Sequence, residues 1–188
     1  STRKAIDLAL KHSSRLHILH ISTAEEVELL HRAREQSDRI TGEVCVHHLW
    51  FSDSDYEQYG SLIKCNPSIK SSSDRDALRQ AARQGVISLV ATDHAPHLLS
   101  EKEAPYLQSP SGIPLVQHSL RAMLELAGKG VFTLIDVVRL MCHAPADCFK
   151  ISRRGYLREG YFADLTIVNL DKPSDATTAY RCRWTPFT

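Results

Sequence analysis

A carboxylate and two imidazoles follow the apolar run 86–92 within one short motif. Asp93, His94 and His97 stand in the stretch ATDHAPH, and a proline precedes the last histidine. Carboxylate oxygens and imidazole nitrogens are ligands of zinc, and a carboxylate beside a metal ion can also act as a general base. Asp93 is therefore a candidate zinc ligand and base, and His97 a candidate donor to a substrate carboxylate or carbonyl. A turn or helix-capping role for Asp93 is the alternative.

A second pair of histidines lies in the apolar stretch LHILHI near the amino terminus. His17 and His20 are three residues apart, so on a strand their side chains face opposite sides. His20 is nearer the carboxyl end of this predicted strand, where α/β barrels place their active sites. Because Asp93 also ends a predicted strand, the two side chains can meet on one metal ion. A structural role for a lone histidine is the alternative.

Further side chains that can bind a metal or a substrate lie between these two motifs. Glu43 begins an apolar stretch that contains the adjacent His47 and His48, and Asn66 precedes a proline. On a strand, adjacent histidines face opposite ways, so we expect structural or indirect roles for them. The carboxylate of Glu43 can equally be solvated, and the amide of Asn66 can bind substrate or form a turn.

The predicted elements that position these side chains alternate between helices and strands. Thr23 and Glu26 have the spacing of a capping box and fix the start of one helix. The alternation is typical of parallel strands with crossover helices, as in barrels and doubly wound sheets. In chain order, we predict a helix over 1–12, a strand over 16–21, a helix over 22–37, a strand over 42–51, a helix over 72–85 and a strand over 86–92.

The rest of the chain supplies a long loop, two helices and a tail. Residues 98–114 form an irregular segment that contains prolines, and long ordered loops after such strands are commonly functional. Helices are predicted over 115–130 and 133–149. The alternation of apolar and polar residues in DLTIVNL predicts short strands close to the carboxyl terminus.

The composition is that of a globular protein. The 188 residues are 43% hydrophobic with a formal net charge of +1, and the absence of a basic block gives no support for binding to nucleic acid or a membrane surface. No apolar run approaches the roughly 20 residues that a membrane helix needs. Five scattered cysteines without a C-x-x-C pair favour reduced thiols and a cytoplasmic protein.

Five motifs, in the order in which they occur along the chain, resemble those of the dihydroorotases, which are cyclic amidohydrolases of the amidohydrolase superfamily. They are LHILHISTAEE, GEVCVHHLWF, IKCNPSIK, SLVATDHAPH and REGYFADLTIV. The resemblance implies an α/β fold in which residues 1–150 form strands 6–8 and the helices of a (β/α)8 TIM-type barrel. Residues 151–188 would form β-sandwich strands and a carboxyl-terminal tail. The implied activity is the zinc-dependent, reversible hydrolysis of dihydroorotate to N-carbamoyl-L-aspartate in pyrimidine biosynthesis.

The resemblance also implies roles for single residues. His20 would bind zinc at the end of strand 6, and Asp93 would bind zinc at the end of strand 8 and act as the catalytic acid or base. Dihydroorotate would be held by Asn66, by His97 and by backbone groups near Gly112.

A further zinc ligand is implied as well. Glu43 matches a glutamate that binds an additional zinc ion in some members, so two zinc ions are expected in a complete active site.

Several parts of the family's active site have no counterpart in this chain. These are the H-x-H pair of strand 1, the bridging lysine or aspartate, the histidine of strand 5 and the substrate-binding arginine. A barrel of this type needs roughly 250 residues. We therefore expect the chain to be the carboxyl-terminal portion of a longer enzyme, inactive without the amino-terminal half of the barrel.

Two other functions compete with dihydroorotase. One is another cyclic amidohydrolase, a hydantoinase (dihydropyrimidinase) or an allantoinase, and the other is a non-catalytic dihydroorotase-like assembly subunit. Asn66 and His97 favour a substrate with a carboxylate, and the retention of His20 and Asp93 argues against a non-catalytic role. The expected partners are the small-molecule substrate, a second copy in a homodimer and, as a candidate, a carbamoyltransferase.

Overall fold

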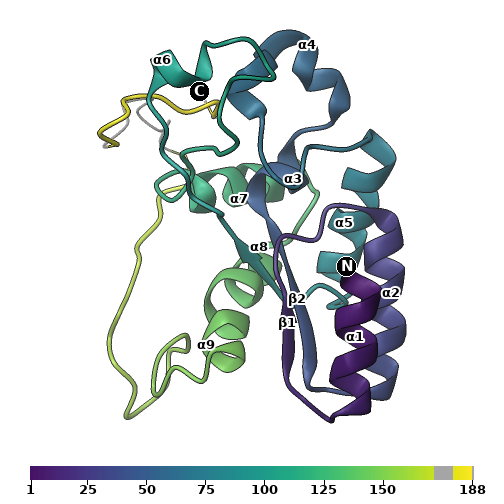
Figure 1. The fold of residues 1–188 in the computed structure, drawn as a ribbon. Helices are drawn as coiled ribbons and strands as arrows, with labels where there is room; N and C mark the ends of the chain where they lie inside the picture. The colour runs from purple at the N-terminus through teal and green to yellow at the C-terminus, as the bar shows by residue number, and fades with distance from the viewer. Residues whose placement is uncertain (172–179, 188) are drawn as a thin grey trace.

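Three parallel strands form the centre of the fold in the computed structural model, which describes residues 1–171 and 180–187. Leu16 pairs with Ile40, and Glu43 pairs with Leu89, so β2 lies between its neighbours. The carboxyl ends of all three strands point toward the top of Figure 1. The strands are β1 (Leu16–Ile18), β2 (Ile40–Cys45) and β3 (Leu89–Ala91).

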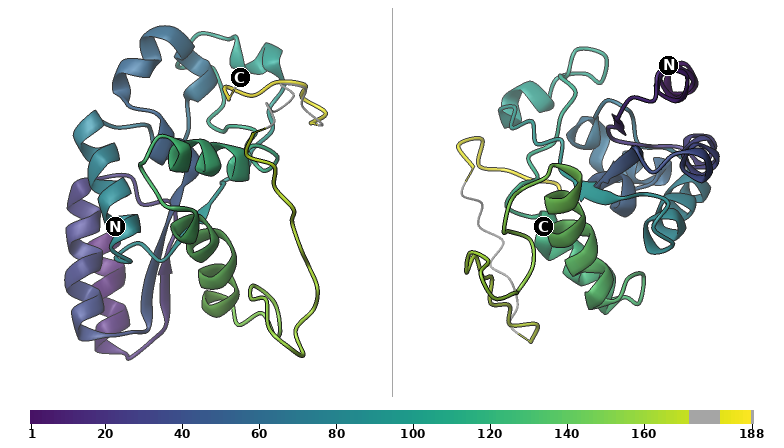
Figure 2. Two further views of the ribbon diagram at one scale, coloured as in Figure 1. Left: turned by 180° about the vertical axis from the view of Figure 1, so that it is seen from behind. Right: turned by 90° about the horizontal axis from the view of Figure 1, so that it is seen from below.

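Helices lie on both sides of this sheet, as expected for parallel strands. One side carries α1 (Thr2–Lys11), α2 (Ala24–Gln36) and α5 (Ser72–Arg83). Figure 2 shows the helices of the other side, which follow β3 in the sequence. They are α7 (Ser119–Gly128), α8 (Leu134–Val138) and α9 (Ala144–Cys148), the last two joined by the π-helical turn Arg139–His143. The α/β character and the parallel strand order predicted from the sequence are confirmed.

The two faces of β2 differ in polarity, and this difference orients the sheet. Ile40 and Val44 are buried in the core between the sheet and the helices. Gly42 lies on the same face, and a Cβ atom there would be 2.6 Å from Cδ1 of Ile21 and 2.8 Å from Cδ2 of Leu30. The glycine therefore lets α2 approach the strand closely. The residues that alternate with these along β2, such as Glu43, face the opposite side of the sheet. This opposite face is the more polar one, and it carries the candidate site residue Glu43.

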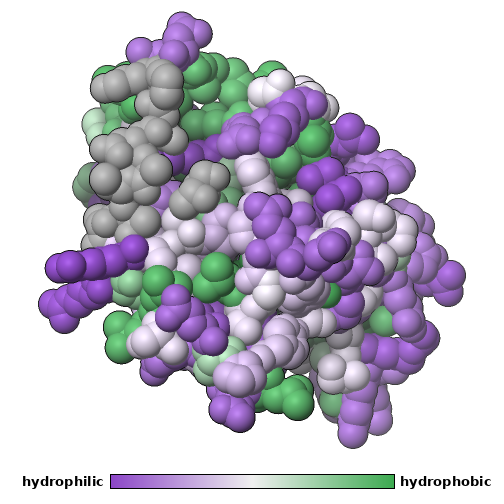
Figure 3. Space-filling model, turned by 90° about the horizontal axis from the view of Figure 1, so that it is seen from above, coloured by the Kyte–Doolittle hydropathy of each residue, from purple (hydrophilic) through white to green (hydrophobic). Residues whose placement is uncertain are grey.

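A layer of short helices covers the carboxyl ends of the strands. A small second core of Phe51, Ile63, Ile113 and other apolar residues holds this layer together. Figure 3 looks down on this end of the molecule and shows hydrophobic side chains reaching the surface among hydrophilic ones. The helices of the layer are α3 (Val46–Trp50), η1 (Asp53–Asp55), α4 (Tyr56–Tyr59), η2 (Gly60–Ile63) and α6 (Leu99–Lys102).

The prediction of a strand over 42–51 is wrong in its second half. The strand ends at Cys45, and residues Val46–Trp50 form α3. Consecutive side chains on a helix are about 100° apart rather than opposed. His47 and His48 therefore do not face opposite sides: both are buried, and their ring centroids are 4.3 Å apart.

The β-sandwich expected from DLTIVNL is not seen in the described part of the tail. Residues 162–169 are extended but belong to no strand, and Ile167 is 97% exposed. An extended segment becomes a strand only when another segment pairs with its backbone, and no described segment does so. Residues 172–179 and 188 lie outside the described residues. The sandwich and the division of the chain at residue 150 remain predictions.

The junction between α2 and α5 depends on one aspartate. Asp74 accepts hydrogen bonds from the backbone N–H of Ala24 and from the hydroxyl of Ser71, and these bonds lower its pKa below the usual value despite partial burial. We expect Asp74→Ala to cost about 1–2 kcal/mol in the free energy of unfolding, as for other capping residues. Because the folded-state pKa is lowered, this contribution should be present at neutral pH and be lost as the pH falls through that value. Denaturant unfolding at pH 7 and pH 3 measures both effects; an equal loss at the two pH values would contradict the assignment.

No helix among the described residues has the length and apolar character that crossing a membrane requires.

Candidate metal and substrate site

The two predicted zinc ligands follow the outer strands of the sheet, at the same end of the molecule. His20 comes two residues after β1, and Asp93 comes two residues after β3. Both have a left-handed backbone, with φ of +37° and +45°, a conformation that is uncommon outside glycine and is concentrated at functional sites. Neither side chain forms a hydrogen bond with any described residue. Their nitrogen and oxygen lone pairs are thus free to bind a ligand.

Both residues influence side chains at and just after the end of β2 through their charges. The carboxylate of Asp93 contributes, after burial itself, to raising the pKa of the Cys45 thiol. The imidazole of His20 contributes to lowering the pKa values of His47 and His48, for which burial is again the largest cause. The end of β2 therefore lies within electrostatic reach of both candidate ligands.

Glu43, the third predicted zinc ligand, binds a histidine instead of standing free. Its Oε2 is 2.9 Å from Nε2 of His17, and Nδ1 of His17 is 2.8 Å from the hydroxyl oxygen of Thr41. Glu43 is only 8% exposed. His17 thus lies on the polar face of the sheet and fixes the position of Glu43, a role that the sequence could not indicate because it depends on the register of β1 and β2.

The predicted substrate residues fall into two places. Asn66 is exposed in the segment that follows η2. Nε2 of His97 lies 3.1 Å from the carbonyl oxygen of Ser111, next to Gly112. A Cβ atom on Gly112 would be 2.5 Å from Cβ of Ala95 and 3.1 Å from Nε2 of His97. The structure therefore brings His97 and Gly112 into direct contact.

His94, the middle residue of the ATDHAPH motif, has a structural role. Its Nδ1 accepts hydrogen bonds from the backbone N–H groups of Leu115, at 2.8 Å, and Val116, at 3.2 Å. These two hydrogen bonds connect the segment after β3 to the start of the helical region that follows the loop.

Lys102 joins the two substrate regions and was not singled out in the sequence. Its side chain is fully buried, and Nζ donates to the carbonyl oxygens of Lys64, Pro110 and Gly112 at 2.9–3.0 Å. Burial lowers the pKa of Lys102 to about 8, so the ammonium is charged at neutral pH and offers three donors to three acceptors. No local sequence signal distinguishes such a lysine from a solvated one.

Gly112 should not tolerate a side chain. Its φ is +143°, and an added Cβ would overlap Ala95. We expect Gly112→Ala to lower the free energy of unfolding by about 1–3 kcal/mol and to displace the ring of His97. Gly130→Ala is the matched control, since φ there is +74° and nothing lies within 4 Å of the added atom. Gly112→Ala introduces both steric overlap and backbone strain, whereas Gly130→Ala introduces backbone strain alone, and thermal unfolding measures the stability of each variant. An equal loss of stability in both would show that the contact with Ala95 is unimportant.

Cys45, His47 and His48 form a buried group whose potential ligand atoms all lie within 4.8 Å of one another. Both ring nitrogens of His47 and Nδ1 of His48 have no hydrogen-bond partner among the described residues. An unpaired buried polar group costs about 1–3 kcal/mol, so three such atoms require an explanation. Cys45 was not a candidate in the sequence because its thiol becomes relevant only when β2 ends and α3 begins.

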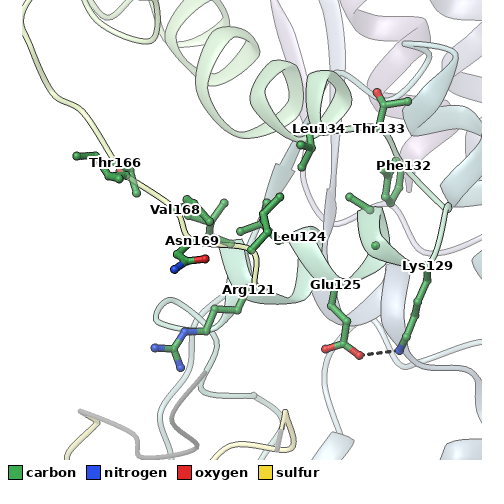
Figure 4. A pocket seen from close by; sticks show the side chains of 15 residues that line it. Arg121, Leu124, Glu125, Lys129, Phe132, Thr133, Leu134, Thr166, Val168 and Asn169 are labelled. Atoms are coloured by element: carbon green, nitrogen blue, oxygen red, sulfur yellow. Dashed lines mark ion pairs between the residues drawn. The ribbon is translucent and has the colours of Figure 1, made fainter. Parts of the chain in front are cut away.

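A wide groove lies away from all of these residues. It has a volume of about 1270 Å³ and runs between α7 and the extended tail, and its lining includes Leu124, Phe132 and Val168 (Figure 4). None of the candidate ligands or substrate residues lines it. The tail forms one side of the groove, and the groove contains none of the residues proposed for catalysis or binding.

A parallel α/β sheet whose free metal-binding side chains stand at the carboxyl ends of its strands is typical of enzymes built on α/β barrels. Comparison with known proteins agrees. Residues 5–185 match the Amidohydrolase family, and the chain belongs to that family.

Curated relatives named dihydroorotase match most of the chain. The protein of Methanosphaera stadtmanae is 33% identical over 190 residues, which is 100% of this chain and 43% of the relative. That of Endomicrobium trichonymphae is 38% identical over 156 residues, 82% of this chain and 37% of the relative. The chain thus spans about two fifths of the length of these relatives.

Solved structures of cyclic amidohydrolases share the fold. An L-hydantoinase (dihydropyrimidinase) from Arthrobacter aurescens gives a TM-score of 0.82 at 28% identity, over 86% of this chain and 37% of that one. Dihydroorotase from Saccharomyces cerevisiae, in complex with 5-fluoroorotic acid, gives 0.71 at 15% identity, over 80% and 42%. At that identity the second likeness supports the fold alone.

Proposed function

We propose that this chain is the carboxyl-terminal portion of a dihydroorotase, which interconverts dihydroorotate and N-carbamoyl-L-aspartate. The single observation that carries the proposal is the pair His20 and Asp93, two free metal-binding side chains with left-handed backbones at the ends of β1 and β3. The dihydroorotase names of relatives at 33–38% identity support it. Under this proposal β1, β2 and β3 correspond to strands 6, 7 and 8 of the barrel.

Zinc fits the donor set that these residues offer. His20 provides an imidazole nitrogen and Asp93 provides carboxylate oxygens, both ordinary zinc ligands. Glu43 is a weaker candidate for a second zinc ion because its Oε2 already binds His17. When bound, zinc would supply Lewis-acid chemistry at the ring carbonyl. Asp93 would hold or move the proton that the ring opening requires.

The substrate would be held by residues that lie beyond the strand ends. As an imidazolium, which has two N–H donors, His97 would donate from Nδ1 to the carboxylate of dihydroorotate while Nε2 donates to Ser111. Nδ1 also lies 3.9 Å from Oε2 of Glu101. The amide of Asn66 is exposed and free to donate, and the backbone near Gly112 approaches closely because no Cβ intervenes. A cyclic amide with one carboxylate matches these donors.

The remaining ligands would come from outside this chain. Two candidate zinc ligands are fewer than the three protein ligands of catalytic zinc sites. We propose that an amino-terminal half of the barrel completes the site, in line with the two fifths of their length that the relatives share with this chain. The isolated 188-residue chain should then be inactive.

The same proposal includes a homodimer, a location in the cytoplasm and association with a carbamoyltransferase.

A hydantoinase is the second candidate, favoured by the TM-score of 0.82 with the L-hydantoinase. The two functions differ in the carboxylate of the substrate. We expect the complete protein to hydrolyse dihydroorotate in preference to hydantoin and allantoin. His97→Ala should raise KM for dihydroorotate about tenfold or more, because a charge-assisted hydrogen bond contributes roughly 1.5–3 kcal/mol.

Steady-state kinetics with the three substrates tests this choice. Preference for hydantoin, with KM unaffected by His97→Ala, would support the hydantoinase. Absence of turnover of all three by zinc-loaded protein would favour the non-catalytic assembly subunit.

A further inference from the structure

A group of three buried side chains that can bind a metal lies at the end of β2 and includes neither of the proposed catalytic ligands. Cys45 ends β2, and His47 and His48 lie in the first turn of α3. Their ligand atoms are within 4.8 Å of one another, and the exposed fractions of the three residues are 0%, 1% and 3%. Nitrogen and sulfur ligands of this kind, gathered this closely, are typical of zinc.

The hydrogen bond of His48 fixes which nitrogen is available. Nε2 lies 3.0 Å from the carbonyl oxygen of Pro67, and a carbonyl only accepts, so Nε2 carries the hydrogen. Nδ1 is then an unprotonated acceptor, since burial lowers the pKa of His48 to about 4. That Nδ1 is buried and has no hydrogen-bond partner in the part of the chain that the structure describes. Zinc-binding histidines commonly donate their second N–H to a backbone carbonyl, which holds the ring in place.

His47 has no hydrogen bond at either nitrogen although it is almost completely buried. Burial lowers its pKa well below the usual value, so the ring is neutral and presents one lone pair. A neutral buried histidine normally has a partner for at least one nitrogen. The described residues provide none, and potential ligand atoms of Cys45 and His48 lie within 4.8 Å.

The third ligand is the thiol of Cys45, and a neighbouring thiol lies beside the group. Cys45 is fully buried, and its Sγ lies within 4.8 Å of the ligand nitrogens of His47 and His48. Cys65 donates to the same Pro67 carbonyl oxygen that accepts from His48, at 3.1 Å. Cys65 therefore adjoins the group without being one of its three members.

We propose that Cys45, His47 and His48 supply three ligands of one zinc ion, at a site distinct from that of His20 and Asp93. Cys45 binds as a thiolate and releases its proton to solvent, while Nδ1 of His48 and one nitrogen of His47 donate their lone pairs. The metal fixes the end of β2 against the start of α3. The inference goes beyond the proposed function, because it requires neither a substrate nor an amino-terminal half of the barrel.

Cobalt substitution tests the site in the complete protein. Thiolate ligation to Co²⁺ gives an intense near-ultraviolet charge-transfer absorption that ligation by histidine and carboxylate alone does not give. We expect this absorption in the cobalt-loaded protein, with loss of the band and of one metal equivalent in Cys45→Ser. Cys182→Ser is the matched control, since its buried thiol bonds to the carbonyl oxygen of Trp184, and it should leave the band unchanged.

Two further measurements keep the test decisive. The zinc-loaded wild-type protein, which needs no variant to fold, should show a sulfur neighbour of zinc at about 2.3 Å in X-ray absorption spectra. Asp93→Ala should keep the cobalt band even where activity is lost, so failure of the proposed function and failure of this site are separable. Absence of the band and of the sulfur neighbour in wild-type protein, or a band unchanged in Cys45→Ser, would overturn the proposal.

Discussion

Asp93→Ala should lower kcat of the complete enzyme for dihydroorotate by roughly 10³-fold or more while leaving the fold intact. The proposed function gives this carboxylate two roles, as a zinc ligand and as the group that moves a proton, and general acid–base catalysis alone contributes about 10²–10⁴-fold. Stability should be retained because the side chain is exposed and has no hydrogen bond to a described residue. Steady-state kinetics and thermal unfolding measure the two effects.

Asp76→Ala is the control for the loss of a carboxylate. Asp76 is itself mostly exposed and forms ion pairs with Arg75, at 3.2 Å, and Arg79, at 3.4 Å. Ion pairs at the surface contribute little. It should change neither turnover nor Tm appreciably. If Asp93→Ala kept turnover within a few-fold of wild type, or lost it only because the protein unfolded, the role assigned to Asp93 would be wrong.

Lys102→Met should be the most destabilising single substitution in the loop region. Methionine fills a similar volume but donates no hydrogen bond, so three carbonyl oxygens, those of Lys64, Pro110 and Gly112, lose their donor. Each unpaired buried group costs about 1–3 kcal/mol, and loss of one partner from a buried charged group costs roughly 3–5 kcal/mol. We expect a loss of about 3–5 kcal/mol in the free energy of unfolding, measured with denaturant.

Lys129→Met separates this effect from the loss of a surface charge. Lys129 pairs with Glu125 at 2.7 Å, and both side chains are more than half exposed, so its loss should cost less than about 1 kcal/mol. In the complete enzyme, Lys102→Met should also raise KM, because the backbone near Gly112 and the segment that leads to Asn66 lose their common anchor. A stability equal to wild type would show that the three carbonyls find other donors.

The sequence predicted those parts of the fold that depend on local pattern. The helices around 2–11, 24–36 and 72–83 follow from apolar spacing and from caps such as Thr23, whose side chain accepts from the N–H of Glu26. The parallel order follows from the alternation of helices and strands. The position of His20 and Asp93 at the same end of the molecule could be predicted because both follow strands of one parallel sheet.

The parts that depend on the register and on long-range contacts could not be predicted. The pairing of Glu43 with His17 requires the register of β1 and β2, which no local pattern reveals. The stretch VCVHHLW is rich in residues that suit a strand, but the chain turns into α3 after Cys45 and buries both histidines. Strands in the tail would need partner strands that the described residues do not supply.

The measurement that tests the central claim most directly is the hydrolysis of dihydroorotate by the complete protein after metal removal and after zinc is restored. The account predicts turnover that disappears with a chelator, returns with zinc, and does not return in Asp93→Ala. Turnover of dihydroorotate that persists without metal, or an inactive wild-type protein that zinc does not restore, would contradict it.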